Sequence, residues 1–301
     1  MPNSHQSVSL LPWLLFVLCW LQSCQIVQSL HPRVINGEDA EAGLAPYQVS
    51  LQKEGWHFCG GSIVTPRWIL SAAHCLVEKL PTVLVGITDL SNAIEGQRYT
   101  ADYMIVHCRY REDSHADDVG LVRVTKAIKY GKFVQPITID WRPVPPGSKL
   151  LITGWGAISF LELSNETSPI EEYPQKLQKL IMTGISLDEC QQYYSTSDET
   201  DAVDLGCLCA FFAGGTCSGD SGGPLVLKGR LVGVVSYGLA CGDNIPDVFA
   251  SMWMYYDFVQ TIIRDCLYHE CKCKEPMLIN QHELFADSHK EKFFKNRRRL
   301  S

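Results

Sequence analysis

The sequence predicts an all-β fold, a sandwich or a barrel, followed by one C-terminal helix. Short apolar β-rich runs recur along residues 34–265, and clusters of Gly, Pro, Asn and Asp separate them. Short strands with regular turn signals are typical of sandwiches and barrels. The runs lie at residues 48–51, 62–70, 82–86, 104–106, 120–124, 150–153, 177–182, 224–227 and 231–237. One helix is indicated at residues 254–263, where Met254, Phe258 and Ile262 fall four apart on one face.

Composition and charge indicate a globular protein. Of the 301 residues, 46% are apolar and 20% are charged, which is enough for a sizeable core. The formal net charge of −7 argues against nucleic acid as a partner. The charge is uneven, because residues 288–301 carry six Lys or Arg and one Glu. We interpret this basic end as a solvated tail, the alternative being a contact with an anionic surface.

The N-terminus is typical of a secretory signal peptide. The apolar run at 10–21 is too short to span a bilayer comfortably, and small polar residues follow it. We expect a signal peptide over residues 1–24, with cleavage as late as residue 29; a signal anchor or a buried strand is the alternative. Eleven of the 13 cysteines lie beyond it, which suits an oxidising compartment. Because no second long apolar run follows, we expect a secreted protein with no membrane span after signal removal.

The strongest local signal is the run GDSGGP at residues 219–224. A serine hydroxyl such as that of Ser221 is a weak nucleophile until a base removes its proton. In a glycine-rich turn, backbone N–H groups can face a developing oxyanion, because no side chains crowd them. By itself the run could also be an ordinary turn before a strand.

Two further side chains complete a candidate triad. His74 lies among small residues after an apolar strand, and histidine is the natural general base near neutral pH. Asp118 directly precedes another apolar strand, where a partly buried carboxylate could orient an imidazole. The neighbouring Asp117 is the rival, and we assign it to a solvated loop. We expect His57 and His107 to be structural.

These residues, in this order and with these flanks, resemble the chymotrypsin-like serine proteases. The resemblance covers about residues 34–265 and includes the motifs CGGS at 59–62, TGWG at 153–156 and VSYG at 235–238. It implies two six-stranded antiparallel β-barrels with a C-terminal helix, and an active site in the cleft between the barrels. Residues 266–301 then form a separate cysteine-containing basic tail.

The resemblance also implies a serine endopeptidase and assigns each role. Ser221 attacks the scissile carbonyl, His74 takes and returns the proton, and Asp118 holds the imidazole. The N–H groups of Gly219 and Ser221 form the oxyanion hole. No cofactor is expected. The expected partners are protein or peptide substrates, an activating protease and protein protease inhibitors, and the chain is expected to be a monomer.

The run RVING at residues 33–37 resembles an activation site. Residues 25–33 would then be a short propeptide. Cleavage after Arg33 would free the amine of Val34, which would pair with Asp220 and order the oxyanion loop, since an unpaired buried charge is very costly. The run departs from the common Ile-Val-Gly-Gly, but Val34 keeps an apolar β-branched end.

The expected specificity pocket is the least conventional part of the sequence. Its base is Gly215, where trypsin-like members carry Asp, whereas Asp247 on the opposite wall replaces a usual glycine. Thr216 lines the same region. Ser236 and Gly238 would pair with the substrate backbone as an added strand, and Gly238 leaves the pocket mouth open.

Two specificities and one non-catalytic role stay open. We favour a chymotrypsin-like preference for Phe, Tyr, Leu or Trp, with Asp247 turned away and hydrated, since a slot without the usual charge suits planar apolar side chains. Some insect chymotrypsins resemble this pocket. The alternative is that Asp247 binds Lys or Arg. The protein could instead be a secreted protease homologue that acts by binding, although the triad and Arg33 are retained.

The cysteines are assigned from the resemblance. It implies three bridges, Cys59–Cys75, Cys190–Cys209 and Cys217–Cys241. Five cysteines stay unassigned, namely Cys108, Cys207, Cys266, Cys271 and Cys273. Either Cys108 or Cys207 could bridge to the tail. The one-residue spacing of Cys271 and Cys273 is poor for zinc, so no metal is expected. Asn165 begins an N-glycosylation sequon.

Overall fold

The computed structural model describes residues 37–161, 170–195, 203–212, 215–238, 245–267 and 271, which belong to one compact unit. Several predictions concern residues outside these ranges, namely the signal peptide, the propeptide, Arg33, Val34, Asn165, Cys241, Cys273 and the basic tail. None of the described helices is long and apolar enough to cross a bilayer.

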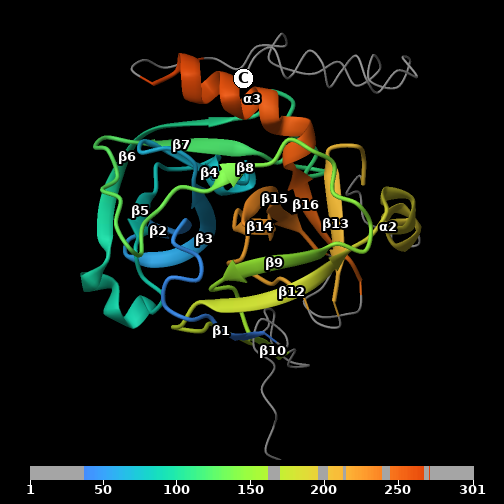
Figure 1. Cartoon of the computed structure of the whole chain (residues 1–301), viewed down its shortest axis with the longest axis horizontal. Helices are drawn as coiled ribbons and strands as arrows, with labels where there is room; N and C mark the ends of the chain where they lie inside the picture. The colour runs from blue at the N-terminus through green and yellow to red at the C-terminus, as the bar shows by residue number, and fades with distance from the viewer. Residues whose placement is uncertain are drawn as a thin grey trace, which may run out of the picture. The chain divides into compact units, whose positions relative to one another are not determined.

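The first barrel is closed by six antiparallel strands in the order β2-β3-β4-β7-β6-β5 (Figure 1). The strands are β2 (Gln48–Lys53), β3 (Trp56–Ile63), β4 (Trp68–Ser71), β5 (Thr82–Val85), β6 (Gln97–Val106) and β7 (Gly120–Val124). Their apolar side chains, such as Val49, Trp68 and Leu121, are fully buried in one core. Closure leaves no edge strand open to pair with another chain.

The run predicted as one strand at 62–70 is in fact the end of β3 and the start of β4. Pro66 lies between them and cannot donate to a strand ladder. The N–H of Val64 donates to the Trp68 carbonyl at 3.0 Å, and the Thr65 hydroxyl accepts the Trp68 N–H at 3.1 Å. The chain therefore turns back on itself, and the two strands pair antiparallel.

The second barrel has the strand order β12-β13-β16-β15-β14-β9 and closes where β9 pairs with β12. Its strands are β9 (Lys149–Gly154), β12 (Gln178–Gly184), β13 (Cys207–Phe211), β14 (Pro224–Leu227), β15 (Arg230–Tyr237) and β16 (Asp247–Ser251). The prediction missed β13 and β16. Both are five residues long, and β16 buries its polar ends Asp247 and Ser251, so neither shows an apolar alternation.

Short elements complete the domain. They are β1 (Glu38–Asp39), β8 (Thr138–Ile139), the hairpin of β10 (Ser159–Leu161) and β11 (Ile170–Glu172), the 3-10 turns η1 (His74–Leu76) and η2 (Leu90–Glu95), and α2 (Leu187–Tyr194). Helix α2 was not predicted. It begins at Ser186, whose hydroxyl accepts the N–H of Glu189 at 3.1 Å as an N-cap.

Helix α3 (Met252–Asp265) follows β16 and extends the predicted helix by a few residues at each end. Its buried face includes Met254, Phe258 and Ile262, which join the hydrophobic core of the first barrel. Figure 1 shows the helix at the top of the view, and it contacts β15 and β16. The predicted fold of two six-stranded antiparallel barrels with a C-terminal helix is therefore confirmed.

The chain beyond α3 is anchored to the first barrel. A disulfide joins Cys266 to Cys271, the Arg123 guanidinium donates to the Cys266 carbonyl at 2.7 Å, and the Cys271 N–H donates to the Tyr103 hydroxyl at 3.0 Å. Cys108 is also disulfide-bonded. Cys207 keeps a thiol, so of the two cysteines considered for a bridge to the tail Cys207 is ruled out, while a bridge from Cys108 stays a prediction.

Candidate active site

His74 and Asp118 are brought together by the pairing of β4 with β7. His74 begins η1 after β4, Asp118 lies two residues before β7, and Ser71 is opposite Gly120 in the strand register. Oδ2 of Asp118 lies 2.8 Å from Nδ1 of His74, and Oδ1 accepts the His74 backbone N–H at 2.9 Å. The register thus places two residues 44 apart in sequence in contact.

The carboxylate of Asp118 is buried and fully engaged. Its residue is 2% exposed, and Oδ2 also accepts the hydroxyl of Ser236 at 2.5 Å. Burial by itself would raise the pKa of Asp118, but the hydrogen bonds from His74 and Ser236 outweigh it and hold the pKa below its ordinary value. Because an ionised carboxylate only accepts, Nδ1 of His74 carries the proton and Nε2 keeps its lone pair.

Ser221 and Gly222 pack against β3 and against the end of β4, the strand that leads to His74. Its carbonyl accepts the N–H of Gly60 at 2.7 Å. The next residue, Gly222, has φ +77°, and a Cβ there would lie 2.1 Å from the Ser71 hydroxyl, so only glycine fits. Within the described residues no hydrogen bond joins the Ser221 hydroxyl to His74; catalytic contacts of this kind often tighten only with substrate.

Two N–H groups of the glycine-rich turn are open to a ligand. In the described part of the chain, the N–H groups of Gly219 and Ser221 donate to no protein acceptor, whereas the Asp220 N–H between them donates to the Cys217 carbonyl at 3.0 Å. Gly219 has φ +96°, which turns its peptide out of the regular path. Unpaired donors on either side of a hydroxyl are the arrangement that stabilises a tetrahedral oxyanion.

His57 supports the same turn, a contact that the sequence did not reveal. Its Nε2 lies 3.0 Å from the carbonyl of Gly219, and its Nδ1 lies 2.9 Å from the Ser50 hydroxyl. Burial lowers the pKa of His57 to about 4, so the neutral ring donates from Nε2 and accepts at Nδ1. No local signal could have found it, because Gly219 is 162 residues away.

Asp220 is buried against the TGWG motif of 153–156. It is 2% exposed, and its carboxylate accepts the N–H groups of Gly156 at 2.9 Å and Cys217 at 3.2 Å. A Cβ at Gly154 or Gly156 would lie 2.0 or 2.3 Å from that carboxylate, which explains the two glycines of the motif. Burial raises the pKa of Asp220 to about 6. No Lys, Arg or His among the described residues forms an ion pair with it.

Asp247 begins β16 beneath the expected pocket. It is 4% exposed, and Oδ2 accepts the N–H of Thr216 at 2.7 Å. A Cβ at Gly215 would lie 3.0 Å from Oδ2, and one at Gly238 would lie 2.8 Å from Oδ1, so the carboxylate sits between these two glycines. The expectation that it turns away and is hydrated is therefore wrong. Burial raises the pKa of Asp247 to about 7.

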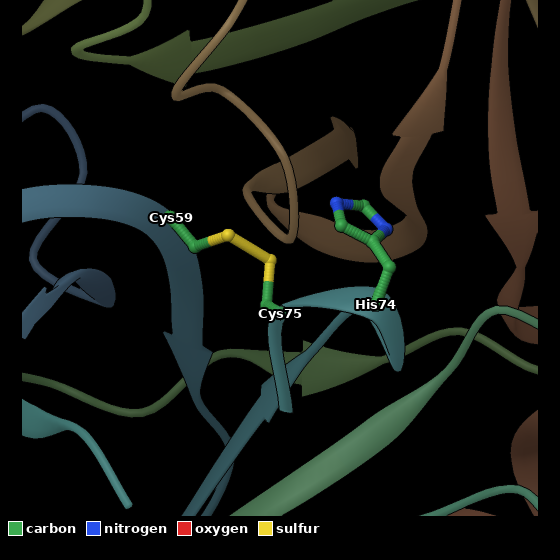
Figure 2. Close-up of side chains that lie close together, drawn as sticks. All are labelled: Cys59, His74 and Cys75. Atoms are coloured by element: carbon green, nitrogen blue, oxygen red, sulfur yellow. A yellow bond between two sulfur atoms is a disulfide. The ribbon is translucent and has the colours of Figure 1, made fainter. Parts of the chain in front are cut away.

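Disulfides fix both sides of the site. Cys59 and Cys75 are bridged, and Figure 2 shows this bridge beside the imidazole of His74. Cys190 and Cys209 are bridged as well, and Cys217 is disulfide-bonded, although Cys241 lies outside the described residues. Potential ligand atoms of Cys59, His74 and Cys75 lie within 4.8 Å of one another, but metals bind thiolates and both sulfurs are in the disulfide, so this group is not a metal centre.

Known proteins share this architecture and sequence. The family model described as Trypsin matches residues 34–259. Chymotrypsin-2 of Vespa crabro is 36% identical over 234 residues, covering 75% of this chain and 98% of that protein, and trypsin II-P29 of Gallus gallus is 32% identical over 238 residues, covering 77% and 89%. The solved structure of neuropsin, a serine protease expressed in mouse brain, matches with a TM-score of 0.67 and 28% identity, covering 75% of this chain and 98% of that one. The chain therefore belongs to the trypsin family and is a serine endopeptidase.

Proposed function

We propose that this protein is a secreted endopeptidase, made as a zymogen, whose catalytic triad is Ser221, His74 and Asp118. One observation carries the proposal. The imidazole of His74 is held at Nδ1 by a buried carboxylate with a lowered pKa, which leaves Nε2 as the acceptor of the neutral ring, and Gly222 of the glycine-rich turn packs against Ser71, three residues before the histidine. That arrangement makes a general base of the histidine.

The proposed reaction has two balanced halves. The Ser221 oxygen attacks the scissile carbonyl while its proton passes to Nε2 of His74, and the N–H groups of Gly219 and Ser221 stabilise the oxyanion. The tetrahedral intermediate collapses as His74 gives the proton to the leaving amine. A water molecule then attacks the acyl-enzyme with the same base, which releases the acid product and restores the serine hydroxyl.

The substrate would bind as an added strand beyond the end of β15. Ser236 lies at this end of β15, with its hydroxyl on Asp118, and Gly238 follows the strand. The backbone here is thus tied directly to the triad. Main-chain pairing with an extended peptide would bring the scissile carbonyl to the turn of Gly219 and Ser221.

For the residue before the cleaved bond, a large apolar or aromatic side chain is the first candidate. Gly215 contributes no side chain to the pocket, and a carboxyl with a pKa of about 7 is neutral in much of the population at neutral pH. Lys or Arg is the second candidate. It is supported by the place of the Asp247 carboxylate between Gly215 and Gly238, where a basic side chain would meet it.

Activation would follow cleavage after Arg33 by another protease. The new ammonium of Val34 would pair with Asp220, whose carboxylate is buried with only backbone donors. A buried carboxylate with a raised pKa favours an incoming positive charge. Secretion is supported by the apolar N-terminal run and by the disulfides. Protein substrates, protein inhibitors and a glycan on Asn165 fit the same setting.

The deciding experiment is labelling with a serine-reactive fluorophosphonate after cleavage at Arg33. We expect labelling of the cleaved protein and none of Ser221→Ala, with the uncleaved precursor labelled far more slowly. Peptide substrates ending in Phe, Leu or Arg then rank the two specificities. A cleaved, folded protein that labels no better than Ser221→Ala would overturn the proposal and favour a role in binding.

A further inference from the structure

Asp117, the residue before the triad aspartate, has an unusual backbone conformation. Its φ is +56°, in the left-handed region that few non-glycine residues adopt. Its carbonyl accepts the N–H of Val119 at 2.8 Å, so Asp118 is the central residue of a three-residue turn. The direction in which Asp118 presents its carboxylate therefore depends on the conformation of Asp117.

The side chain of Asp117 is held by three neighbours. Its Oδ1 lies 3.3 Å from Nδ1 of His107, its Oδ2 lies 3.6 Å from Nε of Arg109, and the nearby hydroxyl of Tyr255 lowers its pKa as a hydrogen-bond donor would. The side chain is only 13% exposed, so the prediction of a solvated loop carboxylate is wrong. Burial raises the pKa of Asp117, while Arg109 and Tyr255 partly offset it.

These neighbours connect the turn to helix α3. Tyr255 is a buried residue of that helix, and the ring of His107 packs edge-on against Tyr255 at 5.4 Å and Phe258 at 4.9 Å. A Cβ at Gly206 would lie 2.1 Å from the Tyr255 hydroxyl, which leaves this hydroxyl little freedom to move.

Other ionisable groups near this contact come from the segment that leads into β13. They are the carboxyl of Asp204, whose pKa is raised by burial, and the thiol of Cys207, whose pKa burial raises to about 12. Both contribute negative charge near the Tyr255 hydroxyl when they are ionised. Arg109 is the cation that faces Asp117 and Asp204 together.

We propose that Asp117 is a positioning residue for Asp118, which ties the turn of the triad aspartate to helix α3 through the hydroxyl of Tyr255. The inference rests on the proposed triad. In this arrangement the last helix of the domain sets the position of a carboxylate more than 130 residues earlier in the chain. The side chain of Asp117 contacts helix α3, and its left-handed backbone conformation sets the direction in which the Asp118 carboxylate points.

Three substitutions at position 117 separate these two contributions. Asp117→Asn keeps an acceptor for Tyr255 and tolerates positive φ, so it should stay within about threefold of wild type. Asp117→Gly keeps the backbone conformation and loses the tie. Asp117→Ala loses both. We expect kcat to fall about 3–10-fold in Asp117→Gly and about 10–100-fold in Asp117→Ala, with KM within about twofold in both, because substrate binding does not involve this turn.

The second test is the coupling between the two ends of the tie. Tyr255→Phe removes only the hydroxyl and should lower kcat about 3–10-fold. The double variant with Asp117→Ala should be no slower than Asp117→Ala itself, because one contact is removed twice. The matched control is Asp140→Asn, a buried carboxyl bonded to Arg142 outside the site, which should keep wild-type kcat.

All rates are measured per site titrated with fluorophosphonate, so that unfolded protein does not count. The acid limb of kcat/KM should move about half a pH unit lower in Asp117→Ala and stay in place in Asp117→Asn, because a displaced carboxylate stabilises the imidazolium less. Wild-type kcat per site in Asp117→Ala, or an unmoved acid limb, would overturn the inference. Wild-type protein that is neither labelled nor active would instead overturn the proposed triad.

Discussion

The carboxylate of the proposed triad and two buried carboxylates of the second barrel are in opposite electrostatic states. Asp118, before the first barrel's β7, accepts from His74 and Ser236, and its pKa lies below the ordinary value. Asp220 and Asp247, in the second barrel, accept mainly from backbone N–H groups, and burial raises their pKa values to about 6 and about 7. His74 and Asp118 already contact each other in the described chain, whereas no Lys, Arg or His among the described residues forms an ion pair with Asp220 or Asp247.

This difference teaches how the site is controlled. A carboxylate whose donors are already present can orient its histidine before any ligand arrives. A buried carboxylate without a cation stays ready to take one, either a new N-terminal ammonium at Asp220 or a basic substrate side chain at Asp247. In the proposed enzyme the contact between His74 and Asp118 is thus built into the fold, while activation and selectivity would depend on charges supplied later.

The largest expected effect comes from the substitution Asp118→Asn, which breaks the contact between this carboxylate and His74. An amide presents an N–H or a neutral oxygen to His74, so the histidine adopts the wrong tautomer, and kcat should fall about 10⁴-fold, a magnitude taken from the family rather than from this structure. Initial rates on a peptide amide measure it. The variant should keep the wild-type KM and fold, so a loss seen only in KM would contradict the assignment.

The sequence indicated the residues of the proposed triad but not the contacts around them. His74, Asp118 and Ser221 are marked by short motifs, because their chemistry needs particular neighbours within a few residues. The contacts of His57 with Gly219 and of Asp117 with Tyr255 join segments far apart in the chain. Such contacts leave no local pattern, since each partner alone reads as an ordinary loop or strand residue.

The same reason explains the outcome for the fold. Apolar runs such as those in β7 and β14 were found with their bounds, because their residues are mostly apolar and turn residues flank them. Strands β13 and β16 were missed, because they are defined by pairing with each other across a long connection and with β12 and β15, and such pairing leaves no local pattern. Because β16 was missed, Asp247 was predicted to be hydrated, since an aspartate at the start of a strand usually indicates an exposed turn.

A second, smaller effect should come from Asp220→Asn, which removes a buried negative charge that forms no ion pair within the described residues. In the activated enzyme the substitution deletes the partner of the Val34 ammonium, and activity should fall at least about 100-fold as the oxyanion turn loses its order. In the precursor it should stabilise the fold at pH 8. An acid whose pKa is raised on folding destabilises the folded state once it ionises, so stability is lost as pH rises from about 4 through about 6.

Thermal unfolding at pH 4 and pH 8 measures that contrast. The experiment uses a Ser221→Ala background, which prevents self-digestion and keeps Asp220 intact in the reference protein. Asp220→Asn should raise the Tm of the precursor at pH 8 and leave it nearly unchanged at pH 4, and after cleavage at Arg33 it should lower the Tm. Equal shifts in precursor and cleaved protein would show that Asp220 has no incoming partner.

The smallest expected effect concerns the specificity pocket and the charge of Asp247. The carboxyl of Asp247, with its pKa raised to about 7, is mostly neutral at pH 6 and mostly ionised at pH 8. The ratio of kcat/KM for an Arg-ended peptide to that for a Phe-ended peptide should therefore rise about tenfold over this range. In Asp247→Asn the ratio should be flat, because the amide has no charge to gain. A wild-type ratio that stays flat would mean that the carboxyl does not meet the substrate side chain, and selectivity would then rest on the apolar shape of the slot around Gly215.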